Sequence, residues 1–234
     1  MKPLLSQLFA QARAAGRKVL DEPAAKRALS AYGLAVPRGV TLAPGMAPAL
    51  EGLRGPFAVK LVSPDASHKS DVGGVRLGLR DAQEVHAAVR EMEALGRAKG
   101  LRVDAVLVEE MAPVGVELAI GGVIDARFGP VLMLGLGGVF IEIFADIAFR
   151  VCPLERRDAQ EMIDELRAAP LLRGARGREP VDEKSVVEAM LALGGPGGLL
   201  VELESEIAEI DVNPLMSSSR GAIACDARIV LSGT

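Results

Sequence analysis

The feature of this sequence that most constrains its fold is the interleaving of short apolar runs with amphipathic segments. The runs have the length of buried strands, and several of the segments between them repeat their apolar residues at helical spacing. Elements in this order favour an α/β or α+β fold with mixed sheets. Strands are expected at 57–62, 74–79, 104–111, 115–124, 130–136 and 147–152. Helices are expected at 3–20, 23–32, 155–168 and 183–193, and after Asp81.

Local signals refine these expectations. Asp81 has the side chain and position of a helix cap, and His86 lies beside the apolar stripe of the helix that follows, which predicts a solvent-facing histidine. Pro170 is expected to end the 155–168 helix. Pro and Gly punctuate 43–56, so little regular structure is expected there.

The order of elements is compatible with two lobes. We expect residues 37–108 to form a smaller lobe, and residues 1–36 together with 109–234 to form a larger one. Length alone does not establish this division, because 234 residues suit one large domain or two modest ones.

Composition excludes some classes of function. The 27 basic and 31 acidic residues give a net charge of -4, and only seven residues are aromatic. A nucleic-acid-binding protein normally carries a basic excess, or aromatic side chains on which bases stack, so nucleic acid is not an expected partner. Cys152 and Cys225 lie in apolar contexts without metal-ligand spacing, which predicts two buried free thiols.

The N-terminal residues show no apolar core of signal-peptide length, and we expect no run of the roughly 20 apolar residues that a membrane span needs. We therefore expect a cytoplasmic protein with no membrane partner.

The densest polar segment is VKLVSPDASHKSDVGGVRLGL, residues 59–79. Lys60 lies within an apolar strand, where a buried ammonium group is costly unless it meets an anion; on a half-exposed strand it would simply face solvent. The loop beyond it offers hydroxyl, ammonium and backbone N–H donors that suit phosphate oxygens, although an ordinary hairpin loop can have the same composition. Its donor-bearing residues are Ser67, His68, Lys69, Ser70, Gly73 and Gly74.

A second candidate is LVEEMAPVGVEL, residues 107–118. One strand ends in Glu109 and Glu110, and after Met111 the next strand begins near Glu117. Backbone groups at such a break could pair with a purine edge, and the later carboxylate could bind ribose hydroxyls. An acidic loop between two strands is the alternative.

The third candidate is the C-terminal hairpin expected within 208–231. Asp211 and Asn213 share one side of the first strand, and a connecting loop of about six residues would bring Asn213 opposite Asp226. A carboxylate and an amide oxygen suit Mg²⁺ when phosphates complete its shell. A polar surface on an edge hairpin is the alternative.

The fourth candidate is MLGLGGVFIEIFADIAFR, residues 133–150. Its glycines allow a close-approach turn. Glu142, Asp146 and Arg150 follow in an apolar stretch, where they serve a site or pair with one another.

The motifs in this order carry a resemblance. The sequence resembles the ATP-grasp domain of the ADP-forming acyl-CoA synthetases. The motifs that carry the resemblance are, in order, a lysine strand, SHKSDVGGV, VEEM followed by GVEL, GLGGVFIE, AFR, DVNPL and a later CDAR. That family is related to the succinyl-CoA synthetase β subunits, and the likeness covers residues 20–232. It implies an ATP-grasp fold in which two lobes clamp ATP or ADP with Mg²⁺.

The resemblance also implies roles for individual residues. His68 resembles a phosphohistidine that passes phosphate to ADP, with Asp211 orienting it. The expected metal ligands are Asn213 and Asp226. The residues expected to contact the nucleotide are Lys60, Lys69, Ser70, Gly73, Gly74, Glu109, Glu110, Met111, Glu117 and Arg150.

The sequence departs from the family in what it lacks. The family otherwise supplies a CoA-binding domain and a CoA-ligase domain that bears the first phosphohistidine, and no Gly-rich dinucleotide turn is present here. This implies the β subunit of a two-chain enzyme, with a CoA-binding α subunit as partner and an α2β2 assembly. The alternatives are a stand-alone ATP-grasp carboxylate ligase and a non-catalytic nucleotide-sensing protein.

Overall fold

The chain forms two compact units in the computed structural model, which describes residues 2–66, 69–138 and 146–233. The large unit comprises Met1–Val36 and Pro113–Thr234, and the small unit comprises Pro37–Ala112. The small unit includes the whole strand that ends at Glu110, in which Glu109 pairs with both Gly39 and Ala58.

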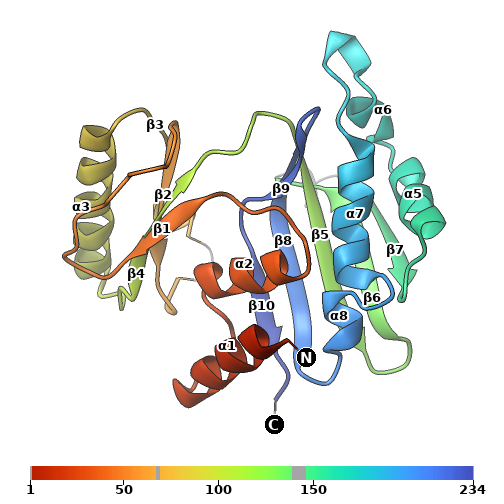
Figure 1. The fold of residues 1–234 in the computed structure, drawn as a ribbon, viewed down its shortest axis with the longest axis horizontal. Coiled ribbons are helices and arrows are strands. Elements are labelled where there is room, and N and C mark those ends of the chain that lie inside the picture. The colour runs from red at the N-terminus through yellow and green to blue at the C-terminus, as the bar shows by residue number, and fades with distance from the viewer. Residues whose placement is uncertain (1, 67–68, 139–145, 234) are drawn as a thin grey trace. The chain divides into compact units, whose positions relative to one another are not determined.

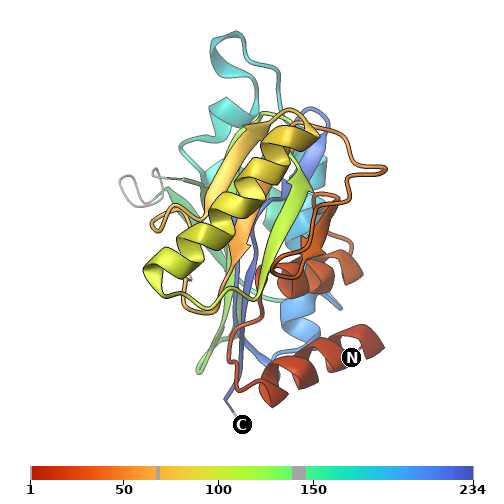
Figure 2. The ribbon, with the colours of Figure 1, turned by 90° about the vertical axis from the view of Figure 1, so that its left-hand side faces the viewer.

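The small unit is an antiparallel four-stranded sheet with a helix packed on one face (Figure 2). The sheet order is β1-β4-β2-β3. The helix packs Val85, Val89 and Met92 against one face of the sheet, and the side chain of Asp81 caps it by accepting a hydrogen bond from the Glu84 amide. Its elements are β1 (Gly39–Leu42), β2 (Phe57–Val62), β3 (Val75–Leu79), α3 (Ala82–Lys99) and β4 (Ala105–Glu110).

The large unit is built on a six-stranded antiparallel sheet in the order β10-β8-β5-β6-β7, with β9 also paired to β8. Its strands are β5 (Val116–Asp125), β6 (Gly129–Leu136), β7 (Ile147–Val151), β8 (Ile207–Ser218), β9 (Gly221–Ala224) and β10 (Arg228–Leu231). Its helices are α1 (Pro3–Ala14), α2 (Glu22–Ala31), α5 (Arg156–Glu165), α6 (Ala169–Leu172), α7 (Glu183–Gly194) and α8 (Leu199–Glu202), with a short 3-10 turn at Ala175–Gly177.

One core holds the large unit together. Alternate residues of the central strands, among them Ile120, Leu132 and Ile210, are fully buried beneath the helices. Helices α7 and α8 lie over β5 and β6 on this face (Figure 1). Because side chains alternate along a strand, the neighbouring residues point to the opposite face.

Two expected helices have different bounds. The first helix ends at Ala14 rather than residue 20, because Gly16 adopts a left-handed conformation (φ +67°) and the Arg17 amide closes the turn onto the Ala12 carbonyl. The second difference concerns Pro170. It does not end a helix over 155–168 but lies in the first turn of α6, a position that suits a residue without an N–H group, after α5 has ended at Glu165.

The C-terminal hairpin also differs from expectation. A turn at Ser219 and Arg220 joins β8 to β9, instead of a loop of six residues. The strand β8 is central in the sheet rather than at its edge, since it pairs with β5 on one side and with β9 and β10 on the other.

Three smaller expectations need correction. His86 is half-buried rather than solvent-facing, with Nε2 3.4 Å from the Pro48 carbonyl oxygen. Cys225 is only half-buried, and its Sγ donates to the Ile223 carbonyl at 3.6 Å. One helical stretch, Glu183–Glu202, does have the length and mean hydropathy (1.2) of a membrane span. It comprises α7 and α8, and its buried leucines and valines belong to the core of the large unit.

Candidate functional site

The small unit buries a lysine and a glutamate together on the sheet face opposite α3. Lys60 Nζ lies 3.2 Å from Glu109 Oε2, and the two side chains are 8% and 3% exposed. They are diagonal neighbours on adjacent strands, since Lys60 pairs with Leu107 and Ala58 with Glu109. Val59 and Leu61 point the other way, into the α3 core. The anion that a buried Lys60 requires is therefore the carboxylate of Glu109.

The glycine-ended loop is closed by its own backbone. The Gly73 amide donates to the Ser70 carbonyl at 3.0 Å, and the Gly74 amide donates to the Lys69 carbonyl at 2.7 Å. Those two N–H groups are thus engaged within the loop, unlike the open phosphate donors that the sequence suggested. Gly73 has a φ of +77°, and Ser70 is exposed while Lys69 is half-buried. His68 and Ser67 lie outside the described residues.

The end of β4 is anchored by main-chain and side-chain contacts. Glu110 Oε1 accepts from the Arg54 amide at 2.8 Å and lies 3.6 Å from the Arg38 guanidinium. The Met111 amide donates to the Pro56 carbonyl at 2.8 Å, and Met111 Sδ accepts from the Gly78 amide at 3.0 Å. The VEEM segment is therefore held in one conformation within the small unit.

In the large unit, Glu117 lies at the start of β5 beside the GLGG turn. Its side chain is exposed on the face opposite the helices, because Leu118 points into the core. The Gly137 amide donates to the Glu117 carbonyl at 2.7 Å, and a β-carbon added at Gly138 would lie 2.9 Å from Glu117 Oε2. Gly138 also has a φ of +63°. The sequence predicts a close-approach turn here, but it does not predict that the turn lies against the Glu117 side chain.

Asn213 lies in a bulge of β8. Leu118 pairs with Leu215 and Ile120 with Val212, so Asn213 and Pro214 together oppose Ala119. Bulges of this kind redirect side chains and occur frequently beside active sites. On its other side, β8 pairs Leu215 with Ala224 and Asp211 with Arg228, and the same register sets Asn213 opposite Asp226, in the gap between β9 and β10.

These two residues fit a magnesium ion that is shared with phosphates. An amide oxygen and a carboxylate are hard ligands of the kind that Mg²⁺ takes, and the Cys225 amide, which donates to the Pro214 carbonyl at 2.9 Å, fixes the two strands at this level. Within the described residues no group of three or more His, Cys, Asp or Glu side chains could hold a metal. Mg²⁺ keeps waters and takes substrate phosphates as ligands, so two protein oxygens suffice for such a site.

Asp211 lies two residues before Asn213 on β8. Its neighbours Ile210 and Val212 are buried in the core, so Asp211 lies on the opposite face, as expected. It pairs with Gly121 of β5, and Glu117 lies further along β5 on this face. The large unit thus gathers Glu117, Asp211 and the Asn213 bulge on or beside the face that its helices leave uncovered.

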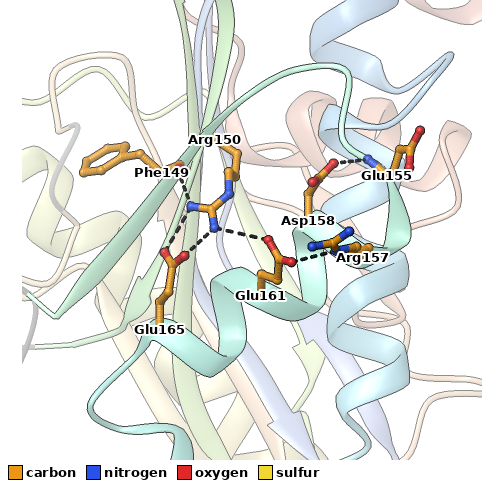
Figure 3. A network of polar contacts seen from close by, with 7 residues as sticks. All are labelled: Phe149, Arg150, Glu155, Arg157, Asp158, Glu161 and Glu165. Carbon is orange, nitrogen blue, oxygen red and sulfur yellow. Dashed lines mark hydrogen bonds and ion pairs between the residues drawn. The ribbon is translucent and has the colours of Figure 1, made fainter.

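Arg150 is not part of that group. It lies on β7 with its side chain directed toward α5, where Nη1 donates to Glu165 Oε2 at 3.0 Å and the guanidinium also reaches Glu161 at 3.8 Å (Figure 3). The hydrogen bond with Glu165 raises the pKa of Arg150 and lowers that of Glu165. Leu132, its partner on β6, points into the core, so Arg150 lies on the opposite face of the sheet from Asp211.

Asp146 has a structural position, and Glu142 lies outside the described residues. The buried carboxylate of Asp146 accepts hydrogen bonds from the amides of Arg167 and Ala168, at 2.9 and 2.8 Å. It therefore fixes the chain entering α6.

Burial raises the pKa of the Cys152 thiol to about 11, so this cysteine stays protonated at neutral pH.

Comparisons with known proteins agree with the fold. A family model of the ATP-grasp domain matches residues 11–231. The chain is 39% identical over 231 residues to the beta subunit of the ADP-forming acetate–CoA ligase I of Pyrococcus furiosus, and the match covers 96% of this chain and 97% of that subunit.

Two further proteins extend the comparison. An acetyl-coenzyme A synthetase 1 of Ca. Korarchaeum cryptofilum, solved with coenzyme A and Mg-AMPPCP, is 41% identical and superposes with a TM-score of 0.81 over 97% of this chain and 99% of that one. An ADP-forming 4-hydroxybutyrate–CoA ligase of Nitrosopumilus maritimus is 35% identical, but the match covers 98% of this chain and only 33% of that protein. The chain has the ATP-grasp fold and belongs to the family of ADP-forming acetate–CoA ligase beta subunits.

Proposed function

We propose that this chain is the nucleotide-binding beta subunit of an ADP-forming acyl-CoA synthetase. The complex would catalyse the reversible reaction of acyl-CoA, ADP and phosphate to the acid, ATP and CoA. The observation that carries the proposal is the end-to-end likeness to a named beta subunit, within a family model of the ATP-grasp domain that matches residues 11–231.

Each unit would contribute separate contacts to ATP or ADP. In the small unit, the Lys60 ammonium, with Lys69 and Ser70 of the loop, would bind phosphate oxygens. Glu109, Glu110 and Met111 would contact the adenine. Support comes from the buried charge at Lys60 and from the fixed conformation of the VEEM segment. Gly73 and Gly74 would shape the loop rather than donate from their amides, which bind loop carbonyls.

In the large unit, Glu117 would bind the ribose hydroxyls, and Asn213 with Asp226 would hold Mg²⁺. A bound Mg²⁺ supplies charge neutralisation for the phosphates. The residues of this chain would fix its position, because the cross-strand register sets Asn213 opposite Asp226.

His68 would carry the phosphoryl group. Imidazole is a nucleophile at neutral pH, and phosphoryl transfer needs positioning and charge neutralisation more than covalent work by the protein. A ring nitrogen forms the N–P bond while the bond between the γ-phosphorus and the bridging oxygen of ATP breaks, which releases ADP; the reverse step makes ATP. In the Korarchaeum protein a phosphohistidine segment points towards the nucleotide binding site. Asp211 would orient the imidazole.

The partner would be a CoA-binding alpha subunit with the first phosphohistidine, in an α2β2 assembly in the cytoplasm. The Pyrococcus relative supports a partner subunit, because it is named the beta subunit of its ligase.

Reconstitution tests the proposal. The chain is mixed with a candidate CoA-binding subunit, and ATP formation is measured from acetyl-CoA, ADP, phosphate and Mg²⁺. We expect neither chain alone to make ATP and the mixture to do so. His68→Asn should abolish this activity, and His86→Asn, which changes the only other histidine, should retain it. Full activity of this chain alone would contradict the proposal and identify a stand-alone ligase.

A further inference from the structure

The large unit exposes an unusual amount of apolar surface along one edge of its sheet. Eight large hydrophobic side chains are exposed among the described residues, and five of them gather on β7, the end of β5 and the β5–β6 turn. They are Val123 (46% exposed), Phe128 (62%), Ile147 (36%), Phe149 (53%) and Val151 (52%).

The register shows that most of these residues share one face. Val151 pairs with Val131 and Phe149 with Met133 across β7 and β6, and Val131 pairs with Val123 of β5. Arg150 points the other way, toward α5, and Figure 3 shows the Phe149 ring directed away from that helix. We call this surface the β7 patch: Val123, Val131, Met133, Ile147, Phe149 and Val151, with Phe128 at its end.

The patch is fixed in shape at its end and adaptable at its centre. Asp125 Oδ1 accepts from the amides of Arg127 and Phe128, at 2.8 and 2.9 Å, which fixes the turn that presents the Phe128 ring. The terminal methyl group of Met133 lies over Gly121, 3.4 Å from where a β-carbon would stand. A flexible thioether of this kind can adapt to an incoming side chain.

An exposed apolar edge is a liability that proteins normally remove with charge or proline. This edge instead carries Phe149, and the chain has only six phenylalanines. Of the four that the structure describes, Phe9 and Phe57 are buried, whereas Phe128 and Phe149 are exposed. Exposed aromatic side chains within an apolar patch are typical of the energetic centre of a protein interface.

We propose that the β7 patch is the surface on which the CoA-binding partner subunit docks, and this inference rests on the proposed function. Two observations favour that occupant. The Pyrococcus relative that this chain matches end to end is named a beta subunit, and subunits that stay together in an enzyme are held by large, apolar interfaces. The patch also continues across β5 to Gly121, which pairs with Asp211 of β8. A partner that binds here would therefore lie beside Asp211, the residue proposed to orient the phosphohistidine.

The test compares two exposed apolar residues on edge strands. Phe149→Asp changes the patch on β7, and Leu77→Asp changes a side chain that is 62% exposed on β3, the edge strand of the small unit. The dissociation constant of each variant is measured against the CoA-binding subunit that restores ligase activity to the wild-type chain. We expect Phe149→Asp to raise it at least about 30-fold, as loss of an interface hot spot does, and Leu77→Asp to leave it within about twofold.

Two controls separate the explanations. The isolated Phe149→Asp chain should keep the wild-type affinity for Mg-ADP and the wild-type melting temperature. An unchanged dissociation constant for Phe149→Asp, or an equal loss in Leu77→Asp, would overturn the docking surface while leaving the proposed function intact. A lower melting temperature with unchanged partner affinity would also overturn it, and would assign the patch to the chain's own packing.

A second copy of this chain is the competing occupant. If the isolated wild-type chain dimerises and Phe149→Asp makes it monomeric, while partner affinity is unaffected, the proposal is wrong. If no CoA-binding subunit restores activity to the wild-type chain, the proposed function fails, and the docking proposal fails with it.

Discussion

Among the described residues, each unit has a buried lysine–glutamate pair, and the two pairs differ in the sequence separation of their partners. In the large unit, Lys26 Nζ lies 2.8 Å from Glu22 Oε1, one turn apart on α2, with side chains 5% and 3% exposed. In the small unit, Lys60 and Glu109 are equally buried but lie 49 residues apart, on β2 and β4. Burial and pairing are thus the same, whereas the surroundings are not.

The comparison teaches that a buried ion pair does not by itself mark a site. The Glu22–Lys26 pair closes within one helix whose alanines and leucine pack into the large core. The Lys60–Glu109 pair lies on the sheet face opposite α3, next to only a small apolar cluster of Val62, Ala105 and Leu107. We therefore expect the first pair to serve stability and the second to serve both stability and anion binding.

The largest expected effect separates the two lysines. Lys26→Met and Lys60→Met each leave a buried carboxylate without its ammonium partner, so each should lower the free energy of unfolding by about 3–5 kcal/mol. Only Lys60→Met should also weaken Mg-ATP binding, by at least about tenfold, because a charge-assisted contact to phosphate is lost. Calorimetric titration with Mg-ATP, at a temperature well below the melting temperatures of both variants, measures the two dissociation constants. Equal nucleotide affinity in the two variants would remove the distinction.

The next effect concerns the bulge of β8. Asn213→Leu and Asp226→Asn should each raise the Mg²⁺ concentration needed for half-maximal ATP formation by about 10–100-fold, because each removes or weakens an oxygen ligand. Asp164→Asn is the matched control: it changes an exposed carboxylate on α5 that pairs with Arg173, and it should leave the Mg²⁺ requirement unchanged. A similar rise in the required Mg²⁺ concentration for Asp164→Asn would indicate a general effect of net charge rather than the loss of metal ligands.

A smaller effect is expected where Gly138 meets Glu117. Gly138→Ala strains a left-handed residue and sets a methyl group against the Glu117 carboxylate, which must move. We expect the KM for ADP to rise several-fold with little change in kcat. Gly129→Ala introduces similar strain (φ +73°) in the β5–β6 turn, with no atom within 4 Å of the added carbon, and should leave the KM for ADP unchanged.

The smallest effect concerns the ion pair of Arg150 with Glu165, which is partly exposed, unlike the two buried lysine–glutamate pairs. Arg150→Met should cost about 0.5 kcal/mol of stability, since both partners are partly solvated, and should leave nucleotide affinity unchanged. The arginine lowers the pKa of Glu165 below its ordinary value of 4.5. The stabilisation is therefore present above that value and is lost as the pH falls through the lowered pKa, so wild type and variant should converge in acid. A loss of nucleotide binding in this variant would restore Arg150 to the site.

The strands and the family could be predicted from the sequence because their signals are local. FAVKLV and its lysine are an example: the run predicts a buried strand, and the cost of burying an ammonium group predicts an anion nearby. That the anion is Glu109 could not be predicted, because the pairing joins residues 49 positions apart and depends on the register of β2 and β4.

The errors arose where tertiary contacts override local pattern. The sequence predicts a connecting loop of about six residues in the C-terminal hairpin, whereas Ser217 and Ser218 continue β8 and pair with β9. The bulge at Asn213 has no signal in the sequence alone. The exposed β7 patch could not be predicted from the sequence, because alternation shows which residues share a face of a strand but not which face the helices cover.

Labelling with γ-labelled ATP and Mg²⁺ tests the central claim most directly. We predict that the chain acquires an acid-labile, base-stable label, that His68→Asn abolishes it, and that His86→Asn retains it. An equal label in His68→Asn, or no label in the wild-type chain under conditions where it binds ATP, would contradict the assignment of the phosphoryl carrier.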